Sequence, residues 1–185
     1  MAKDKKLGSK RGIETMFRTS YRVNMDLSAL ADNKANIMIS INGIIVSIII
    51  ASVAPRATTD PWLLIPSSIL LVTCVAAIVY AVLAARPRVN SNSISLDDVR
   101  ENRANILFFG NFANMSKDDY VEGMTDLMQS TDLLYLNMVR DLYGLGSVLS
   151  RKYRLVRTSY TIFMWGFTLS ILVFIAFFVY FAVTE

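Results

Sequence analysis

The chain has 185 residues, of which 54% are hydrophobic, and a net charge of +4. Its length suits one domain, and its apolar residues collect in three uncharged blocks, a distribution typical of membrane proteins rather than of a soluble core. There is no histidine and one cysteine, Cys74, so an internal disulfide and a multi-cysteine zinc site are excluded and the usual general base is missing. We therefore expect a protein that is not an enzyme and carries no cofactor or metal.

Residues 1–34 form a basic tail followed by an amphipathic helix. Lysines in the first ten residues suit a position beside anionic lipid headgroups. From Gly12 onward, apolar residues recur at helical spacing on one face: Ile13, Met16, Val23, Leu27 and Leu30. Neither proline nor glycine separates this pattern from the apolar block that follows. The sequence thus predicts one long helix from about Gly12 to about Val53.

Three segments are predicted to cross the bilayer: residues 35–54, 61–85 and 159–183. Each is uncharged and reaches the length of about 20 residues that a membrane-spanning helix needs. The first follows 34 residues rich in polar side chains and has a long apolar core, so we expect a retained transmembrane helix and not a cleaved signal. The connection between the first two is short and bounded by Pro55 and Pro61, which predicts a helical hairpin.

The distribution of lysine and arginine predicts the orientation. Residues 1–34 carry eight, the connection carries one (Arg56), residues 86–158 carry ten, and none follows. By the positive-inside rule, residues 1–34 and 86–158 are cytoplasmic. The expected fold class is therefore an all-α membrane protein with three transmembrane helices and long cytoplasmic helical extensions, with the N-terminus inside and the C-terminus outside.

Within the cytoplasmic helical region, residues 86–158, two capping patterns predict helix starts. Ser95 is followed by Asp98, and Ser116 is followed by Asp119, which favours helices beginning at Leu96 and Lys117. The aromatic segment Ile106–Ala113 between them fits either a buried extended piece or a segment lying at the membrane interface.

A heptad-like stripe then runs toward the third span, with steps of three and four residues. Its members are Val121, Met124, Met128, Thr131, Tyr135, Met138, Leu142, Leu145 and Leu149. This spacing is the signature of a helix that packs along a seam against other helices. We expect a long helix, either continuous or broken near Thr131, that runs into the membrane.

Polar and small residues form a second stripe, on the first span. Asn33, Asn36, Ser40, Gly43 and Ser47 share one face, and Asn42 lies off it. An unpaired amide in lipid is costly, so these groups should face protein or water. Two interpretations remain open: helix–helix packing within or between subunits, and a pore or ligand-gated seam.

Charged residues supply the candidate ligand contacts. Asp32 and Lys34 lie where the helix meets the membrane surface, which suits a salt link, a headgroup contact or a ligand. Arg100 and Arg103 suit phosphate, although the acidic residues interleaved with them equally fit a self-paired surface. The basic collar before the third span, Arg151, Lys152, Arg154 and Arg157, fits a positive-inside anchor.

The run GIETMFRTSYRVNMDLSALADNKANIMISINGIIVSI, residues 12–48, resembles the opening of the transmembrane type of Pycsar effector protein. Its core is Arg22, Leu27-Ser28, Ala31-Asp32 and Lys34-Ala35-Asn36. The resemblance extends through residues 83–89 and 96–112 to the terminal span, and so covers nearly the whole chain.

The resemblance implies a role in bacterial antiphage immunity. In such systems a cyclase makes cyclic CMP or cyclic UMP on infection, and the effector then impairs the inner membrane. It implies a multi-pass inner-membrane protein that oligomerises, contacts the lipid bilayer and responds to a cyclic pyrimidine nucleotide, with no nucleic-acid partner. We take Arg22, Asp32, Lys34, Arg100 and Arg103 as its candidate ligand-binding residues. The alternative is a membrane scaffold or regulatory subunit that recruits a cytoplasmic partner through the helix at residues 117–150.

Overall fold

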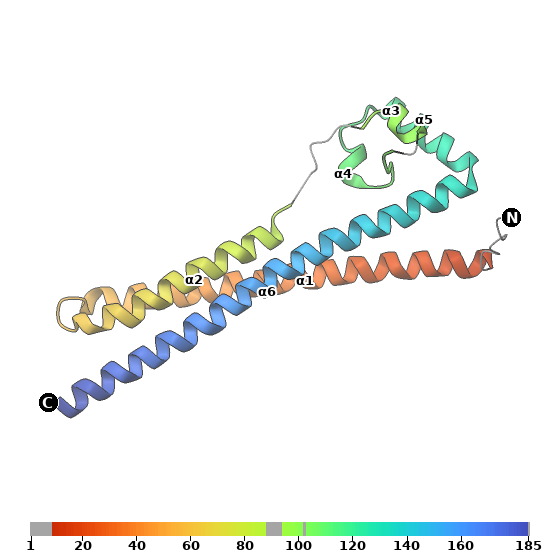
Figure 1. The fold of residues 1–185 in the computed structure, drawn as a ribbon. Coiled ribbons are helices and arrows are strands. Elements are labelled where there is room, and N and C mark those ends of the chain that lie inside the picture. Colours follow the sequence, from red (N-terminus) through yellow and green to blue (C-terminus); the bar gives the residue numbers. More distant parts are fainter. Residues whose placement is uncertain (1–8, 88–93, 102, 185) are drawn as a thin grey trace. The chain divides into compact units, whose positions relative to one another are not determined.

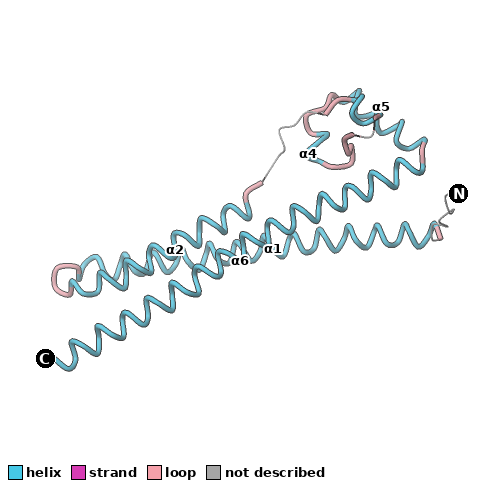
Figure 2. The backbone as a smooth tube through the Cα atoms, in the orientation of Figure 1, coloured by secondary structure: helices cyan, strands magenta, loops and turns pink. Residues whose placement is uncertain are grey.

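The computed structural model describes residues 9–87, 94–101 and 103–184 (Figure 1). This part of the chain is helical with connecting turns, and it contains no strand (Figure 2). The elements in chain order are α1 (Lys10–Val53), the 3-10 turns η1 (Ala54–Arg56) and η2 (Pro61–Leu63), α2 (Leu64–Ala85), α3 (Leu96–Arg100), α4 (Phe109–Phe112), α5 (Lys117–Gln129) and α6 (Thr131–Thr184).

The chain divides into two compact units. Unit 1 comprises Met1–Leu27 and Pro87–Ser150, and unit 2 comprises Ser28–Arg86 and Arg151–Glu185. The long helices α1 and α6 each contribute residues to both units. Unit 2 holds the apolar stretches of all three helices that are long and apolar enough to cross a membrane.

The helical hairpin forms as predicted. Helix α1 is continuous from Lys10 to Val53, and η1 and η2 make the turn that leads into α2. Pro66 lies in the first turn of α2, where the missing N–H costs no helical hydrogen bond. Helix α2 ends at Ala85, and the following Arg86 has an extended backbone because a residue before a proline avoids the helical region.

Of the two alternatives for this helix, continuous or broken near Thr131, the structure has the broken one. Helix α5 ends at Gln129, and Ser130 takes an extended backbone conformation before α6 begins. The Ser130 hydroxyl accepts the Leu133 N–H at 3.4 Å, so one residue both ends a helix and caps the next. Helix α6 then continues through Gly144 and Gly146 without interruption.

Both predicted capping patterns are confirmed, and of the two alternatives for the aromatic segment, the extended piece is wrong. Ser95 makes a reciprocal capping box with Asp98, and the Ser116 hydroxyl accepts the Asp119 N–H. The segment Ile106–Ala113 is not extended: it is a turn followed by the single turn of α4. The Asn105 side chain stabilises the turn by accepting the Leu107 N–H at 3.0 Å, and the fully buried Ile106 fills the core of unit 1 with Val99 and Leu127.

The cores of the two units use residues of different size. In unit 1, Gly123 lets α5 approach Ile106 closely, since a Cβ there would lie 2.8 Å from the Ile106 side chain. In unit 2 the buried cluster consists mainly of alanines: Ala35, Ala77, Ala81 and Ala84. Met38 and Val156 complete it. Small residues at the contact bring helices close together, as in other membrane helix bundles.

Candidate functional site

Unit 1 contains a buried polar cluster that joins α1, α6 and the turn before α4. The Tyr21 hydroxyl donates to Oδ2 of Asp141, and Asn105 Nδ2 donates to Oδ1 of the same carboxylate at 3.4 Å. Asp141 is only 5% exposed and Asn105 only 9%. The stack of Phe17 on Tyr135, with ring centroids 6.1 Å apart, packs the same two helices together one to two turns earlier. We call Tyr21, Asn105 and Asp141 the Asp141 cluster.

The turn before α4 fixes the amide of Asn105. Its Oδ1 accepts the backbone N–H of Leu107 at 3.0 Å, and its backbone carbonyl accepts Nδ2 of Asn111 at 2.9 Å. With the amide oxygen occupied by the turn, the amide N–H₂ is left to point at Asp141. The aromatic segment therefore positions a hydrogen-bond donor for the carboxylate.

The electrostatics of the Asp141 cluster are unusual for a buried carboxylate. No lysine or arginine pairs with Asp141 anywhere in the described ranges of the chain. Burial, followed by the hydrogen bond to Asp141 and the repulsion of its charge, raises the pKa of Tyr21 above its ordinary value of 10.0. Removing a carboxylate from water without a cation is costly. The cluster thus favours additional hydrogen-bond donors or positive charge.

A second buried amide lies one helical turn before Asp141. Asn137 is 2% exposed, and its Nδ2 donates to the Leu133 carbonyl at 3.0 Å. Its Oδ1 has no hydrogen-bond partner among the described residues. Neither Asn137 nor Asp141 is predicted by the heptad-like stripe, because that stripe is defined mainly by apolar positions. The detectable signal was a pair of polar residues four apart beside that stripe.

Two of the predicted ligand-binding residues, Arg100 and Arg103, form ion pairs with neighbouring acidic side chains. Arg100 pairs with Glu122 and, at 2.9 Å, with Asp126, and these hydrogen bonds raise the pKa of its guanidinium. Arg103 pairs with Asp98 at 3.2 Å and Glu101 at 2.7 Å. The self-paired surface therefore describes both arginines, and their role in ligand binding remains a prediction.

Arg22, the third candidate in unit 1, is exposed on α1 and follows Tyr21 directly. Arg103 lies two residues before Asn105 in the sequence and is 61% exposed in its side chain. Two exposed guanidinium groups are thus near neighbours in sequence of members of the Asp141 cluster. Arg100, in contrast, links α3 to α5.

The remaining two candidates, Asp32 and Lys34, lie in unit 2. Lys152 Nζ donates to both carboxylate oxygens of Asp32 at 2.8 Å and to the Ser28 hydroxyl at 3.1 Å. The salt link expected for Asp32 is therefore present, with a partner from the basic collar. Lys34 is exposed on α1.

The polar stripe on the first span is not packed within this chain. Asn33, Asn36, Ser40 and Ser47 are exposed and Gly43 is half-buried. Asn42, which lies off the stripe, is instead fully buried; its Nδ2 donates to the Met38 carbonyl at 2.8 Å, while its Oδ1 has no partner in the described part of the molecule. Packing inside one subunit therefore does not account for the stripe.

Two hydroxyl groups and a close approach hold α2 against α6 in unit 2. Ser159 donates to the Ala77 carbonyl at 2.7 Å, and Ser170 donates to the Pro66 carbonyl at 2.8 Å. Gly166 lies so close to Thr73 that a Cβ would overlap its side chain. The isoleucines of α1, in contrast, point outward: Ile37, Ile41, Ile44 and Ile48 are exposed. Small inward residues and large outward ones are the arrangement expected of helices in lipid.

The fold and these sites define a helical membrane protein with three apolar helices and a polar unit that carries its own core. A family model, that of the Pycsar effector protein domain, PycTM, matches residues 15–181. The match covers most of the chain, so the chain belongs to the Pycsar effector family, and the resemblance found in the sequence is confirmed. Membership makes it an effector of antiphage defence. Comparisons with curated proteins and with solved structures gave no match.

Proposed function

We propose that the chain is a multi-pass effector of the bacterial inner membrane, with its N-terminus inside, that responds to cyclic CMP or cyclic UMP. It oligomerises when activated and impairs the membrane, without catalysing a reaction itself. The observation that carries this proposal is the buried, cation-free carboxylate of the Asp141 cluster, in the unit that the positive-inside rule places in the cytoplasm.

The chemistry of the Asp141 cluster suits a pyrimidine base. A carboxylate accepts from the amino group of cytosine or the ring N–H of uracil, and the side-chain amides of Asn105 and Asn137 can donate to or accept from the base edge. Arg22 and Arg103 would bind the cyclic phosphate, because a guanidinium matches phosphate oxygens with two parallel hydrogen bonds. The proposal leaves Arg100 and Asp32 in their structural ion pairs and gives Lys34 a lipid headgroup.

A nucleotide that binds Asp141 competes with the hydroxyl of Tyr21. Because Tyr21 lies on α1 and Asp141 on α6, loss of their hydrogen bond releases one helix from the other in unit 1. Both helices continue without a break into unit 2, so the change passes along the backbone to the apolar stretches. The ligand shifts the equilibrium by the difference between its affinities for the two states.

The exposed polar stripe supports an oligomeric output. Amides and hydroxyls on a spanning helix must meet protein or water. The Ser47 hydroxyl donates to the Gly43 carbonyl at 3.0 Å, whereas Asn33, Asn36 and Ser40 are exposed. In the proposed assembly, the stripe of Asn33, Asn36, Ser40, Gly43 and Ser47 meets its equivalent on other copies. It then either locks the helices together or lines a polar path.

Binding of cyclic nucleotide to the purified full chain tests the ligand site. We expect Arg22→Gln and Asp141→Asn each to weaken binding at least about tenfold, the loss of one charge-assisted contact. Arg18→Gln is the matched control, since Arg18 is an exposed arginine one turn earlier on α1. Equal binding by all three variants would reject the site.

Growth arrest in cells that produce the nucleotide tests the stripe. Asn36→Leu combined with Ser40→Leu should abolish arrest, because leucine side chains are stable in contact with acyl chains and the amide and hydroxyl of the stripe are lost. Ile37→Leu combined with Ile41→Leu, at exposed positions directly beside them, should leave it intact. Arrest that persists in the first double variant contradicts the stripe mechanism.

A scaffold function is the second candidate, favoured by exposed apolar residues on the unit 1 part of α6. Val139 is 54% exposed and Tyr143 is 80% exposed. Such residues suit a docking surface. Affinity capture of the full chain that recovers a stoichiometric soluble partner supports this function, whereas recovery of homo-oligomers alone counts against it.

A further inference from the structure

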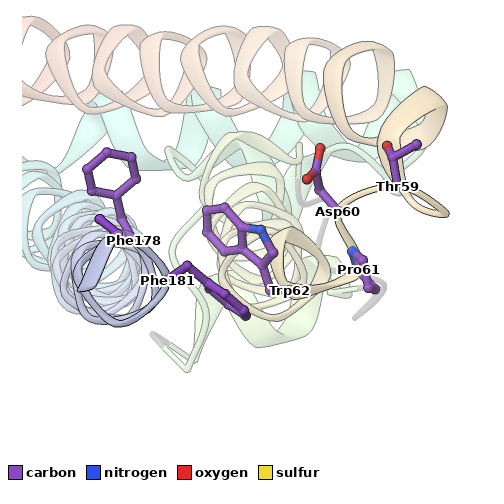
Figure 3. Close-up of a pocket in the computed structure, with 7 residues that line it drawn as sticks. Thr59, Asp60, Pro61, Trp62, Phe178 and Phe181 are labelled. Carbon is purple, nitrogen blue, oxygen red and sulfur yellow. The ribbon is translucent and has the colours of Figure 1, made fainter. Parts of the chain in front are cut away.

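Unit 2 contains an open pocket at the helical hairpin. It has a volume of about 470 Å³ and lies between the turn residues Thr59–Trp62 and the last turns of α6, at Phe178 and Phe181 (Figure 3). Small-molecule sites fall in the range of about 300–1,000 Å³, so this pocket has room for a ligand of that class. None of its residues takes part in the contacts described for the nucleotide or for the polar stripe.

Aromatic rings form one wall of the pocket. The Trp62 ring centroid lies 5.8 Å from Phe174, 6.4 Å from Phe177 and 5.7 Å from Phe181. Of the phenylalanines of α6, Phe178 and Phe181 line the pocket, and Figure 3 shows the indole of Trp62 between Phe178 and the carboxylate of Asp60. Trp62 is the second residue of the apolar stretch Pro61–Ala85, so it sits at the level of the headgroups when that stretch spans a bilayer. The face of an indole attracts cations more strongly than any other side-chain ring.

The hairpin turn supplies one negative and one positive charge. Asp60 lines the pocket, and no lysine or arginine pairs with it within the described ranges. Arg56 precedes it by one turn, and the Asp60 N–H donates to the Arg56 carbonyl at 2.9 Å. The guanidinium of Arg56 is exposed. A carboxylate and a guanidinium on one turn complement a ligand that carries both an ammonium and a phosphate.

We propose that this pocket binds the headgroup of phosphatidylethanolamine. The primary ammonium donates to Asp60 and lies against the face of Trp62, the phosphate binds Arg56, and the acyl chains run along Phe178 and Phe181. A primary ammonium is favoured over choline because it can donate hydrogen bonds to the carboxylate. The charge pair also disfavours an anionic headgroup, which offers Asp60 no cation. The site anchors the hairpin to its leaflet and operates without nucleotide.

The test uses the full chain with Trp165→Phe, which leaves Trp62 as the single tryptophan. The protein is reconstituted in phosphatidylcholine nanodiscs that contain equal small fractions of a lipid with brominated acyl chains. Bromine quenches the fluorescence of a nearby tryptophan, so the quenching reports how often the brominated lipid lies beside Trp62. The headgroup of that lipid is varied between phosphatidylethanolamine, phosphatidylcholine and phosphatidylglycerol. We expect quenching by brominated phosphatidylethanolamine to exceed that by the other two by about two- to tenfold, the preference that one net hydrogen bond from the primary ammonium to the Asp60 carboxylate provides.

Variants at the turn separate the site from bulk lipid. Asp60→Asn should abolish the preference, Asp60→Glu should retain it, and Ser52→Ala, in the exposed end of α1 outside the pocket, should leave it unchanged. Equal quenching by the three headgroups, or a preference that survives Asp60→Asn, overturns the proposal. Native mass spectrometry gives an independent readout, because retained phosphatidylethanolamine should disappear in Asp60→Asn alone. No nucleotide is present, so neither result depends on the proposed activation.

Discussion

Both units join α1 to α6 through a polar pair of residues that are 120 positions apart, but the two pairs differ in charge balance. In unit 2, Asp32 meets the ammonium of Lys152, and the aspartate side chain is 40% exposed. In unit 1, the partners of Asp141 among the described residues are a phenol and an amide, and Asp141 is 5% exposed. The carboxylate of Asp32 thus has a cationic partner and is partly hydrated, whereas that of Asp141 is buried and has no cationic partner among the described residues.

This difference indicates separate tasks. A paired, partly solvated carboxylate gains little from a new ligand, whereas a buried carboxylate without a cation gains a hydrogen bond or a counter-charge. The cores follow the same division: unit 2 packs alanines and a glycine closely, and unit 1 packs longer side chains around Ile106. We infer that unit 2 holds the helices together and that unit 1 is where a ligand acts.

The largest expected effect is on the close packing of unit 2. Gly166→Ala should destabilise it by about 1–3 kcal/mol, since the new Cβ overlaps Thr73 and both residues sit on helices that have little freedom to shift. Unfolding of the micelle-bound protein by a denaturing detergent, followed by circular dichroism, measures this change. Gly146→Ala, on the same helix, is the control, because its Cβ would meet nothing within 4 Å. A similar loss in both variants would show that close approach is not the cause.

The next prediction tests whether the buried carboxylate of Asp141 depends on its hydrogen-bond donors for stability. Tyr21→Phe should cost about 1–3 kcal/mol, because a buried carboxylate loses one of its two donors. Adding Asp141→Leu should recover much of that loss, since an apolar pair leaves no unsatisfied charge. A double-mutant cycle on unit 1 stability measures the coupling, with the exposed Tyr143→Phe as control. Additive losses in the double variant would contradict this interpretation.

A smaller effect is expected for the ion pair of unit 2. Lys152→Gln should cost at most about 1 kcal/mol, because the pair is partly exposed and its attraction is screened by water. The difference should shrink at high salt. Lys34→Gln serves as the control, as Lys34 is exposed and makes no ion pair within the described residues. A loss that does not depend on salt would argue that Lys152 acts through packing.

The smallest effect concerns the cap of α3. Hydrogen bonds from the Ser95 side chain and backbone, followed by the charge of Arg103, lower the pKa of Asp98. Its contribution is therefore present above the unfolded pKa and lost as pH falls through the folded pKa. Ser95→Ala should speed amide exchange in α3 several-fold at neutral pH and reduce its acid sensitivity. Ser147→Ala, at an exposed hydroxyl, should change neither.

Much of the fold could be predicted from sequence because its signals are local. The apolar blocks, the Ser95 and Ser116 caps and the break before Thr131 each depend on a few neighbouring residues, and all are present. The packed face of α1 could not be predicted from its large apolar residues. The structure buries Phe17, Ala31, Ala35 and Met38 and exposes Met16, Val23 and Leu30.

Within the span at residues 35–54, the physical reason is that large apolar side chains need not be buried in protein, and Ile37, Ile41 and Ile44 are exposed there. In water, large apolar residues mark the buried face; in a bilayer they can face lipid, and small residues mark the helix contact. The Asp141 cluster was missed for another reason. Its members come from three segments far apart in the sequence, and no local pattern links Tyr21, Asn105 and Asp141.

The decisive measurement is the membrane potential of cells that express the chain, with and without a cyclase that makes cyclic CMP or cyclic UMP. We predict depolarisation and dye uptake only when one of these nucleotides is produced, and neither response in Asp141→Asn. Depolarisation without nucleotide, or an unchanged potential with both nucleotides, would contradict a membrane effector that a cyclic pyrimidine nucleotide activates through unit 1.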